Sequence, residues 1–297
     1  MIGGANADSD GSKSFEIISF EDLKSCRKVP HFIHDINAPI LFTTPNNFLM
    51  VCSGKRHVKS KSCFNIQIDQ WTHFNELNQV RIDAAVAQNK KATFLFGGCD
   101  SPTTFEYMNH NDSKWKSGRS TIPNGFTRGC AISVSEAEIW LIGGSMHSKR
   151  ILIFNTKTQT FKIHSLRLKM GRIAHRCAML SKKAIIITGG KSDQSFWLNS
   201  TEIIDLNLMK IVYGSPLNVQ RAYHGIGFVN LKNENTLAVF GGYNSVNGKL
   251  NTIETYDKGL HKWNIADTYL SEAKINFGFS TISSNSFCIE NVIKKEN

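Results

Sequence analysis

The chain has 297 residues, of which 41% are hydrophobic, and its formal net charge at pH 7 is +11. This length allows a large core, and no apolar run approaches the length of a membrane span. The excess of Lys and Arg favours acidic partners and faster encounter with them. The sequence therefore predicts a globular protein that binds no membrane.

The chain begins with small, polar residues, so residues 1–12 are predicted to form a disordered tail. A single domain is predicted to fill residues 13–297. Two short strands, over residues 15–20 and 23–29, are expected to open it. No apolar core of a signal peptide precedes them.

Four diglycines then recur at intervals of 46, 46 and 52 residues, and each ends a short apolar run. A period of this length, with four strands in each unit, is typical of the blades of a β-propeller. Less complete copies lie at residues 48–54 and 286–291. The diglycines are Gly97-Gly98, Gly143-Gly144, Gly189-Gly190 and Gly241-Gly242.

The clearest period covers residues 221–266, where the segments AYHGIGFV, TLAVFGG, LNTIETYD and HKWNIA each alternate as a strand does. A hydrophobic run that ends in Gly-Gly, then Leu-Asn-x-x-Glu-x-Tyr-Asp, then Trp resembles the kelch repeat. The resemblance covers about residues 14–297 and is weakest at both ends. It implies an all-β, six-bladed kelch-type propeller.

Closure of the ring is expected to join the two ends of the chain. The C-terminal part supplies only two strands, around residues 277–282 and 286–289, and the N-terminal part has two left over. Together they would make one composite last blade, which avoids an unpaired strand edge.

Several recurring residues are predicted to be structural. The glycines end strands where a side chain would meet a neighbouring backbone. Three tryptophans are expected to wedge between blades, whereas Trp197 lies in a lengthened loop and is expected to be partly exposed. The three are Trp71, Trp115 and Trp263.

The seven cysteines are scattered and lack zinc-finger spacing. Cys52, Cys130, Cys177 and Cys288 lie in apolar strands, where a free thiol behaves as a small hydrophobe. This pattern favours a reducing compartment, the cytoplasm or else the nucleus.

No motif for a catalytic site, a nucleotide or a metal is found, so no cofactor, metal or catalytic residue is predicted. His175 and His224 occupy matching inner-strand positions. They are interpreted as packing residues. The alternative is a channel-based enzyme or small-molecule binder of the kelch/galactose-oxidase-like type, with these two histidines lining the channel.

A cation precedes or opens each inner strand, except in the first blade, which has Asp35 there. Equivalent positions in a propeller lie on one circle, so a ring of cations is expected around the channel mouth. In the alternative interpretation these cations only cap strand ends. The cations are Arg81, Arg128, Arg172, Arg221 and Lys274.

The resemblance implies that the loops before the first strand and after the second strand form a binding face, on which Arg reads acidic peptides. The candidate residues of these loops are Ser145, Ser192, Trp197, Tyr243 and Asn244. The predicted function is a non-catalytic, monomeric protein-interaction module that binds an acidic or phosphorylated protein segment at the channel mouth. It would serve as a substrate-recognition subunit of a ubiquitin ligase or as a cytoskeletal or trafficking scaffold. Nucleic acid is disfavoured because no basic helix, RNA-binding aromatic motif or zinc knuckle occurs.

Overall fold

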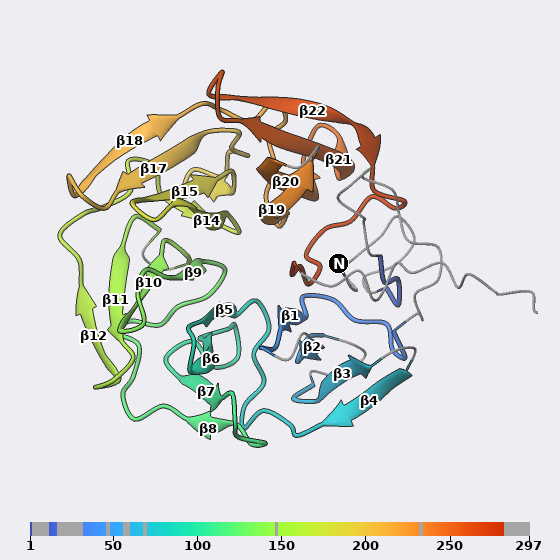
Figure 1. Ribbon diagram of the computed structural model, residues 1–297, viewed down its shortest axis with the longest axis vertical. Helices are drawn as coiled ribbons and strands as arrows, with labels where there is room; N and C mark the ends of the chain where they lie inside the picture. Colours follow the sequence, from blue (N-terminus) through green and yellow to red (C-terminus); the bar gives the residue numbers. More distant parts are fainter. Residues whose placement is uncertain are drawn as a thin grey trace, which may run out of the picture.

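The computed structural model describes residues 1, 12–16, 32–45, 48–55, 60–67, 70–145, 148–231 and 234–281. Within these ranges there is no helix, and five four-stranded antiparallel sheets are arranged as blades around a central axis (Figure 1). The chain is therefore an all-β propeller, as the diglycine period predicts. No helix long and apolar enough to cross a lipid bilayer occurs in the described ranges.

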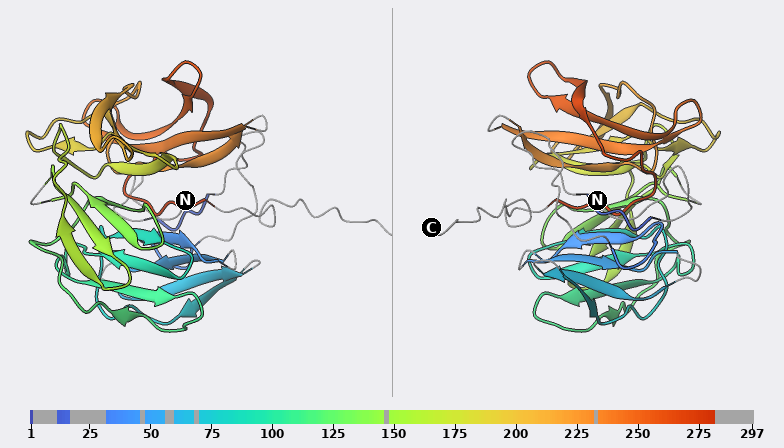
Figure 2. Two further views of the ribbon diagram at one scale, coloured as in Figure 1. Left: turned by 60° about the vertical axis from the view of Figure 1, so that its left-hand side comes forward. Right: turned by 90° about the vertical axis from the view of Figure 1, so that its right-hand side faces the viewer.

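The strands of a blade neighbour one another in chain order, with the first strand nearest the axis and the fourth at the rim (Figures 1 and 2). Blades 1 to 3 are β1 (Ile40–Thr43), β2 (Leu49–Cys52), β3 (Cys63–Gln67), β4 (Gln70–Phe74); β5 (Ala85–Gln88), β6 (Ala92–Phe96), β7 (Phe105–Asn109), β8 (Lys116–Ser117); β9 (Cys130–Ser133), β10 (Glu138–Ile142), β11 (Ile151–Asn155), β12 (Thr160–Ile163). Blades 4 and 5 are β14 (Arg176–Ser181), β15 (Ala184–Thr188), β17 (Thr201–Asp205), β18 (Lys210–Gly214); β19 (Gly225–Leu231), β20 (Glu234–Asn244), β21 (Gly248–Asp257), β22 (Lys262–Tyr269). The short strands β13 (Arg172–Ile173) and β16 (Lys191–Ser192) pair with each other beside blade 4.

The sequence predicts six blades, whereas the described residues form five. Residues 17–31 and 282–297, which hold most of the strands assigned to the sixth blade, lie outside the described residues, as do residues 2–11 of the predicted tail. The described terminal segments meet through the side chains of Glu16 and Lys274, 3.7 Å apart, and not through a four-stranded sheet. Closure of the ring by strands from both ends is therefore not seen.

The diglycines make a backbone contact between neighbouring blades. The N–H of each second glycine donates to a carbonyl just before the next blade, with N···O distances of 2.8 to 3.1 Å. The first glycine cannot carry a side chain, because a Cβ on Gly97 would lie 1.8 Å from the carbonyl oxygen of Phe126. The structural role predicted for the glycines is confirmed. The hydrogen bonds join Gly98 to Phe126, Gly144 to Arg172, Gly190 to Arg221 and Gly242 to Lys274.

A second set of backbone contacts encircles the axis. Six non-glycine residues at equivalent positions adopt φ between 53° and 58°; five of them lie just before the innermost strands of the blades, and the sixth lies after blade 5. Side chains disfavour this left-handed conformation. Five backbone N–H···O bonds of 2.6 to 3.2 Å connect these residues from one blade position to the next, and this offsets the strain. The six residues are Ala38, Asp83, Arg128, Ala174, Tyr223 and Asn276.

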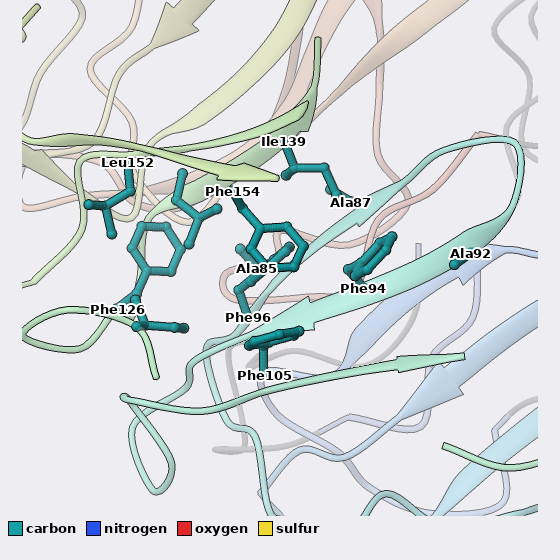
Figure 3. Close-up of a cluster of buried hydrophobic side chains, with 12 residues drawn as sticks. Ala85, Ala87, Ala92, Phe94, Phe96, Phe105, Phe126, Ile139, Leu152 and Phe154 are labelled. Atoms are coloured by element: carbon teal, nitrogen blue, oxygen red, sulfur yellow. The ribbon is translucent and has the colours of Figure 1, made fainter. Parts of the chain in front are cut away.

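The hydrophobic core lies between the faces of adjacent sheets. Phe96 and Phe105 of blade 2 pack on Phe154 of blade 3, with ring centroids 5.1 and 4.8 Å apart (Figure 3). Trp115 is buried against blade 1 and Trp263 against blade 4, as the wedge interpretation predicts. The side chains that pack between the faces of neighbouring sheets therefore hold the blades together, along with the backbone hydrogen bonds described above.

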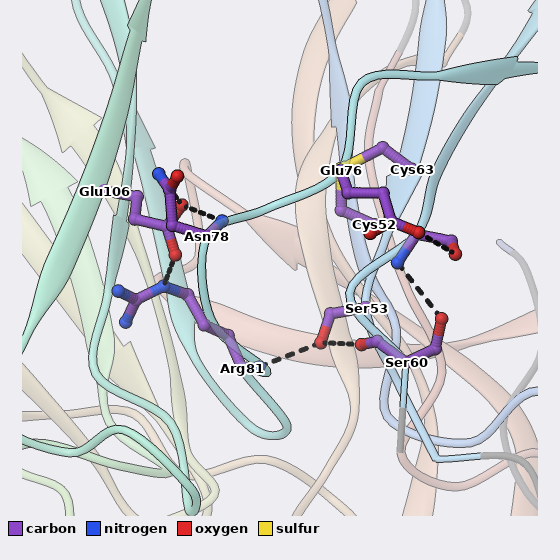
Figure 4. The surroundings of a disulfide bond; sticks show 9 residues. Cys52, Ser53, Ser60, Cys63, Glu76, Asn78, Arg81 and Glu106 are labelled. Carbon is purple, nitrogen blue, oxygen red and sulfur yellow. Dashed lines mark hydrogen bonds and ion pairs between the residues drawn. A yellow bond between two sulfur atoms is a disulfide. The ribbon is translucent and has the colours of Figure 1, made fainter. Parts of the chain in front are cut away.

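The cysteines differ from the prediction. Cys52 and Cys63 form a disulfide between the directly paired strands β2 and β3 (Figure 4), and Cys130 and Cys177 join the inner strands of blades 3 and 4. Three of these cysteines are expected from the sequence to be free thiols. Two contacts explain the error: the pairing of β2 with β3 places Cys52 opposite Cys63, and the contact between β9 and β14 of adjacent blades brings Cys130 to Cys177, 47 residues further along the chain. The cysteine pattern therefore no longer favours a reducing compartment, since disulfides persist in oxidising ones.

The buried tryptophans give a test of the fold. Trp115→Ala or Trp263→Ala is expected to lower the free energy of unfolding by about 3–5 kcal/mol, because each leaves a large cavity between blades. Trp197 is only half-buried, so Trp197→Ala is expected to cost less than 1 kcal/mol. Urea denaturation followed by circular dichroism measures all three. Similar losses at positions 115 and 197 would contradict the inter-blade assignment.

Candidate functional site

Three of the predicted cations are buried inside the blades that they open. Each of these arginines is 0% exposed, and its guanidinium lies 2.7 to 2.8 Å from a glutamate of the third strand of the same blade. Figure 4 shows one such pair. The pairs are Arg81–Glu106, Arg172–Glu202 and Arg221–Glu254.

The pair in blade 5 shows what the ion pair holds in place. Arg221 Nη1 donates to the carbonyl of the first glycine, Gly241, at 2.7 Å. Glu254 accepts the backbone N–H groups of Asn218 and Val219 at 2.7 and 3.0 Å. The pair therefore ties the strand-two turn, the third strand and the incoming loop together.

Arg128 does not share this position. It belongs to the left-handed ring, two residues later in the repeat, and Phe126 stands where the other blades have arginine. Phe126 packs in the same core cluster as Leu152, which replaces the glutamate. The incoming loop has Pro123 where the other blades donate an N–H to that glutamate. Blade 3 thus replaces the ion pair with an apolar pair and removes one backbone donor that the glutamate would have satisfied.

The expected ring of exposed cations is therefore wrong. Arg81, Arg172 and Arg221 are buried, Lys274 is 1% exposed beside Glu16, and only Arg128, with 39% of its side chain exposed, reaches solvent. The four buried cations fit the alternative interpretation, in which they hold the ends of strands. Burial lowers the pKa of Arg81, Arg172, Arg221 and Lys274, and the nearby glutamates oppose this shift.

Breaking one pair tests this role. Glu254→Leu leaves Arg221 charged and unpartnered in the core and takes the acceptor from two N–H groups, so the free energy of unfolding is expected to fall by about 3–5 kcal/mol. Glu234→Leu, an exposed change in the same blade, is the control and is expected to cost less than 1 kcal/mol. Urea denaturation compares them, and a loss for Glu254→Leu as small as that of the control would show that the pair is dispensable.

The channel mouth itself offers little space. Arg128 Nε lies 2.9 Å from Asp83 Oδ2, and both residues line a hollow of about 40 Å³ together with Arg176, Tyr223 and other residues of the inner strands and their approaches. Burial lowers the pKa of Arg176 and raises the pKa of Tyr223. A cavity of about 220 Å³ follows deeper along the inner strands. Within the described residues, this entrance leaves little open space for a partner.

The two inner-strand histidines pack between blades. His175 and His224 are 0% and 1% exposed, and each lies against the first glycine of the preceding blade: a Cβ on Gly143 would lie 2.6 Å from His175 Cε1, and one on Gly189 3.1 Å from His224 Cε1. His224 Nε2 pairs with the hydroxyl of Thr188 at 2.9 Å. Across the described ranges, no group of three or more His, Cys, Asp or Glu is placed to hold a metal ion.

The buried histidines make stability depend on pH. Burial, and then the charges of Arg172 and Arg176, lower the pKa of His175 to about 3. Because an unfolded histidine has a pKa of about 6.5, the unfolded chain takes up a proton there that the folded chain refuses. Stability is therefore expected to fall by about 1.4 kcal/mol per pH unit below about 6.5 on account of His175. Urea denaturation between pH 7 and 5 should show a shallower pH slope for His175→Gln. An unchanged slope would contradict the burial of a neutral ring.

A groove of about 730 Å³ opens between the loops of blades 3 and 4. Lys149, Arg167 and Lys191 line it beside the carboxylate of Asp193. Arg150 closes one wall, with its two Nη atoms 2.8 and 2.9 Å from the carbonyls of Pro123 and Gly125. In the described part of the chain, none of the four cations has a carboxylate within ion-pair distance. The groove therefore carries an excess of unneutralised positive charge.

An aromatic shelf adjoins the groove; it consists of Trp197 and Tyr243, from the hairpin tips of blades 4 and 5. Their ring centroids lie 4.9 Å apart, edge to face. Lys191 Nζ lies 5.3 Å from the Trp197 ring centroid, so the same lysine belongs to both surfaces. Phe196 and Val246, on the same two tips, are 64% and 82% exposed. Groove and shelf thus form one surface on the face where the second strands end.

The loop candidates predicted from the sequence divide between these parts. Ser145 and Ser192 line the groove, and Trp197 and Tyr243 make the shelf. Asn244 is 1% exposed and holds its own turn, because its Oδ1 accepts the N–H groups of Val246 and Asn247 at 3.0 and 2.7 Å.

Lys149 and Arg167 are not among the sequence candidates. Lys149 lies in the loop after β10, five residues beyond the second glycine of blade 3, and Arg167 lies in the loop that leads to blade 4. The signal that could have found Arg167 is its place between an outer strand and the next inner strand, since such loops emerge on the same face as the diglycine loops.

Comparison with known proteins supports the repeat assignment. The chain is 28% identical over 200 residues to a Kelch repeat-containing protein of Dictyostelium discoideum. The match covers 59% of this chain and 30% of that protein, so the chain spans less than a third of its relative. No family-level sequence profile matches the chain. Together with the observed propeller, the relative confirms the resemblance to kelch repeats, a repeat suited to protein interaction.

Proposed function

We propose that this propeller is a protein-interaction module whose groove between blades 3 and 4 binds an acidic segment of a partner protein. The observation that carries the proposal is the groove itself, where Lys149, Arg167 and Lys191, with the buried Arg150 in the wall, outnumber the single carboxylate of Asp193. Arg and Lys bind carboxylates through charge-assisted hydrogen bonds, and the planar guanidinium of Arg167 suits a bidentate contact. The chain's net charge of +11 has the matching sign for attracting such a segment.

Size and exposure favour the groove over the channel mouth. The groove offers about 730 Å³, whereas the hollow at the channel mouth offers about 40 Å³. Lys149 and Arg167 are exposed, whereas Arg128 at the channel mouth already pairs with Asp83. An acidic segment of several residues needs a long binding surface and cations that are not already paired with carboxylates, and the groove provides both.

The kelch-like relative and the fold agree with this class of function. Repeat propellers present several loops on one face of a rigid scaffold, and such loops commonly carry binding residues. The binding face in this proposal is built by the loop after the second strand and the loop before the next blade. These are the two loop classes that the resemblance singles out, although different residues in them carry the charge.

Charge reversal in the groove tests the proposal. Lys149→Glu combined with Arg167→Glu is expected to weaken binding of a fluorescein-labelled oligoglutamate peptide at least tenfold, measured by fluorescence anisotropy. Binding by the unchanged protein is expected to weaken as salt rises, because exposed charges are screened within about 8 Å at physiological ionic strength. A phosphoserine peptide of equal length, in a parallel titration, shows whether phosphate replaces carboxylate.

The matched control changes the same charge elsewhere. Lys114→Glu combined with Lys162→Glu alters two exposed lysines of blades 2 and 3 outside the groove lining. It is expected to lower affinity less than threefold. Equal losses from the two double variants would mean that net charge alone attracts the peptide and that the groove is not the site.

A further inference from the structure

We infer that the partner segment carries a bulky apolar side chain beside its acidic residues, and that this side chain packs on the Trp197–Tyr243 shelf. This inference rests on the proposed function, since the shelf would act on the same segment that the groove holds. The shelf would thus require an apolar residue in the partner segment, whereas the charged groove requires only acidic residues.

The first observation is the unusual exposure of apolar groups at two neighbouring tips. Phe196 is 64% exposed at the blade 4 tip and Val246 is 82% exposed at the blade 5 tip. Single exposed apolar residues are common, but a group of them on a polar rim marks interaction surfaces. Between these tips lie the touching rings of Trp197 and Tyr243.

The second observation is that both tips are well defined. The hairpin of blade 4 is closed by a bridge between Lys191 and Trp197, and the Phe196 N–H donates to Ser192 Oγ at 3.1 Å. The hairpin of blade 5 is held by Asn244, whose side-chain amide donates to the Gln220 carbonyl at 2.7 Å. An aromatic surface fixed in this way loses little conformational entropy when a ligand packs on it.

The third observation sets the spacing, along the partner segment, between the acidic residue that meets the groove and the apolar residue that meets the shelf. Lys191 lines the groove, and its Nζ lies 5.3 Å from the centre of the Trp197 ring. Because an extended chain advances about 3.3 Å per residue, the apolar residue is expected about one to three residues from the carboxylate that meets Lys191. The partner segment that we propose is therefore short and extended, and it combines acidic residues with one large aliphatic or aromatic residue.

A positional peptide library tests this requirement on the full chain. The probe is a set of fluorescein-labelled nine-residue peptides that contain two adjacent glutamates, with each flanking position fixed in turn as Leu, Phe, Ser or Lys and the others randomised. Anisotropy is expected to show about tenfold tighter binding with Leu or Phe than with Ser at one position within three residues of the glutamates. Trp197→Ala is expected to remove this preference, so that the Leu, Phe and Ser peptides bind this variant with equal affinity.

Control variants separate the shelf from general hydrophobicity and from folding. Leu260→Ala removes an apolar residue that is 66% exposed in the turn between β21 and β22, outside the shelf, and is expected to keep the preference. Trp197→Phe retains an aromatic ring and is expected to restore most of it. Thermal unfolding of each variant shows whether the fold is intact.

The outcomes distinguish the two proposals. Acidic peptides that bind through Lys149 and Arg167, with no apolar preference at any position, would overturn the shelf and leave the groove in place. An apolar preference that survives Trp197→Ala would also overturn the shelf. No binding of any glutamate-containing peptide would overturn the proposed function and, with it, the inference drawn from it.

Discussion

The hydrogen bond from the second glycine of one blade to the backbone carbonyl that precedes the next blade is the contact on which the arrangement depends. A single four-stranded sheet exposes two apolar faces and cannot fold alone, so each blade needs a neighbour at a fixed distance and angle. The bond from Gly98 to Phe126, repeated at three further boundaries, sets that distance through the backbone. With the sheets fixed in this way, the aromatic side chains of neighbouring blades can pack against each other in only one relative position.

The residue whose carbonyl accepts this hydrogen bond carries one of two kinds of buried side-chain pair. Three blades bury an arginine with a glutamate, and blade 3 buries Phe126 with Leu152. A buried ion pair is rarely more stabilising than an apolar pair of similar volume, so its presence does not mark the stronger blades. The Nη1 atom of each arginine, however, also donates to the carbonyl of the first glycine in the strand-two turn. In blade 3, Pro123 occupies the position whose N–H donates to the glutamate in the other three blades, so one donor that needs the carboxylate is absent.

The sequence could predict the features that repeat and not those that depend on contacts between distant residues. The diglycine turns and the tryptophan wedges follow from period and alternation alone. The burial of Arg172 could not be seen, because its partner Glu202 lies 30 residues further along the chain. The sequence places Arg128 at the wrong position because this arginine occurs two residues after the repeat position, and the register is visible only in its positive φ and in the bond from Gly98 to Phe126. The groove joins loops of two blades, and its charge belongs to neither loop alone.

The disulfide between Cys130 and Cys177 cross-links the inner strands of the two blades whose loops form the groove. Both cysteines line the cavity of about 220 Å³ along the inner strands, so this covalent link limits how far the two blades can move apart near the axis. If the groove binds the proposed segment, this link would keep the groove at a nearly constant width before the segment arrives. Association would then resemble lock-and-key docking, with the entropy of ordering borne by the peptide and hardly at all by the protein.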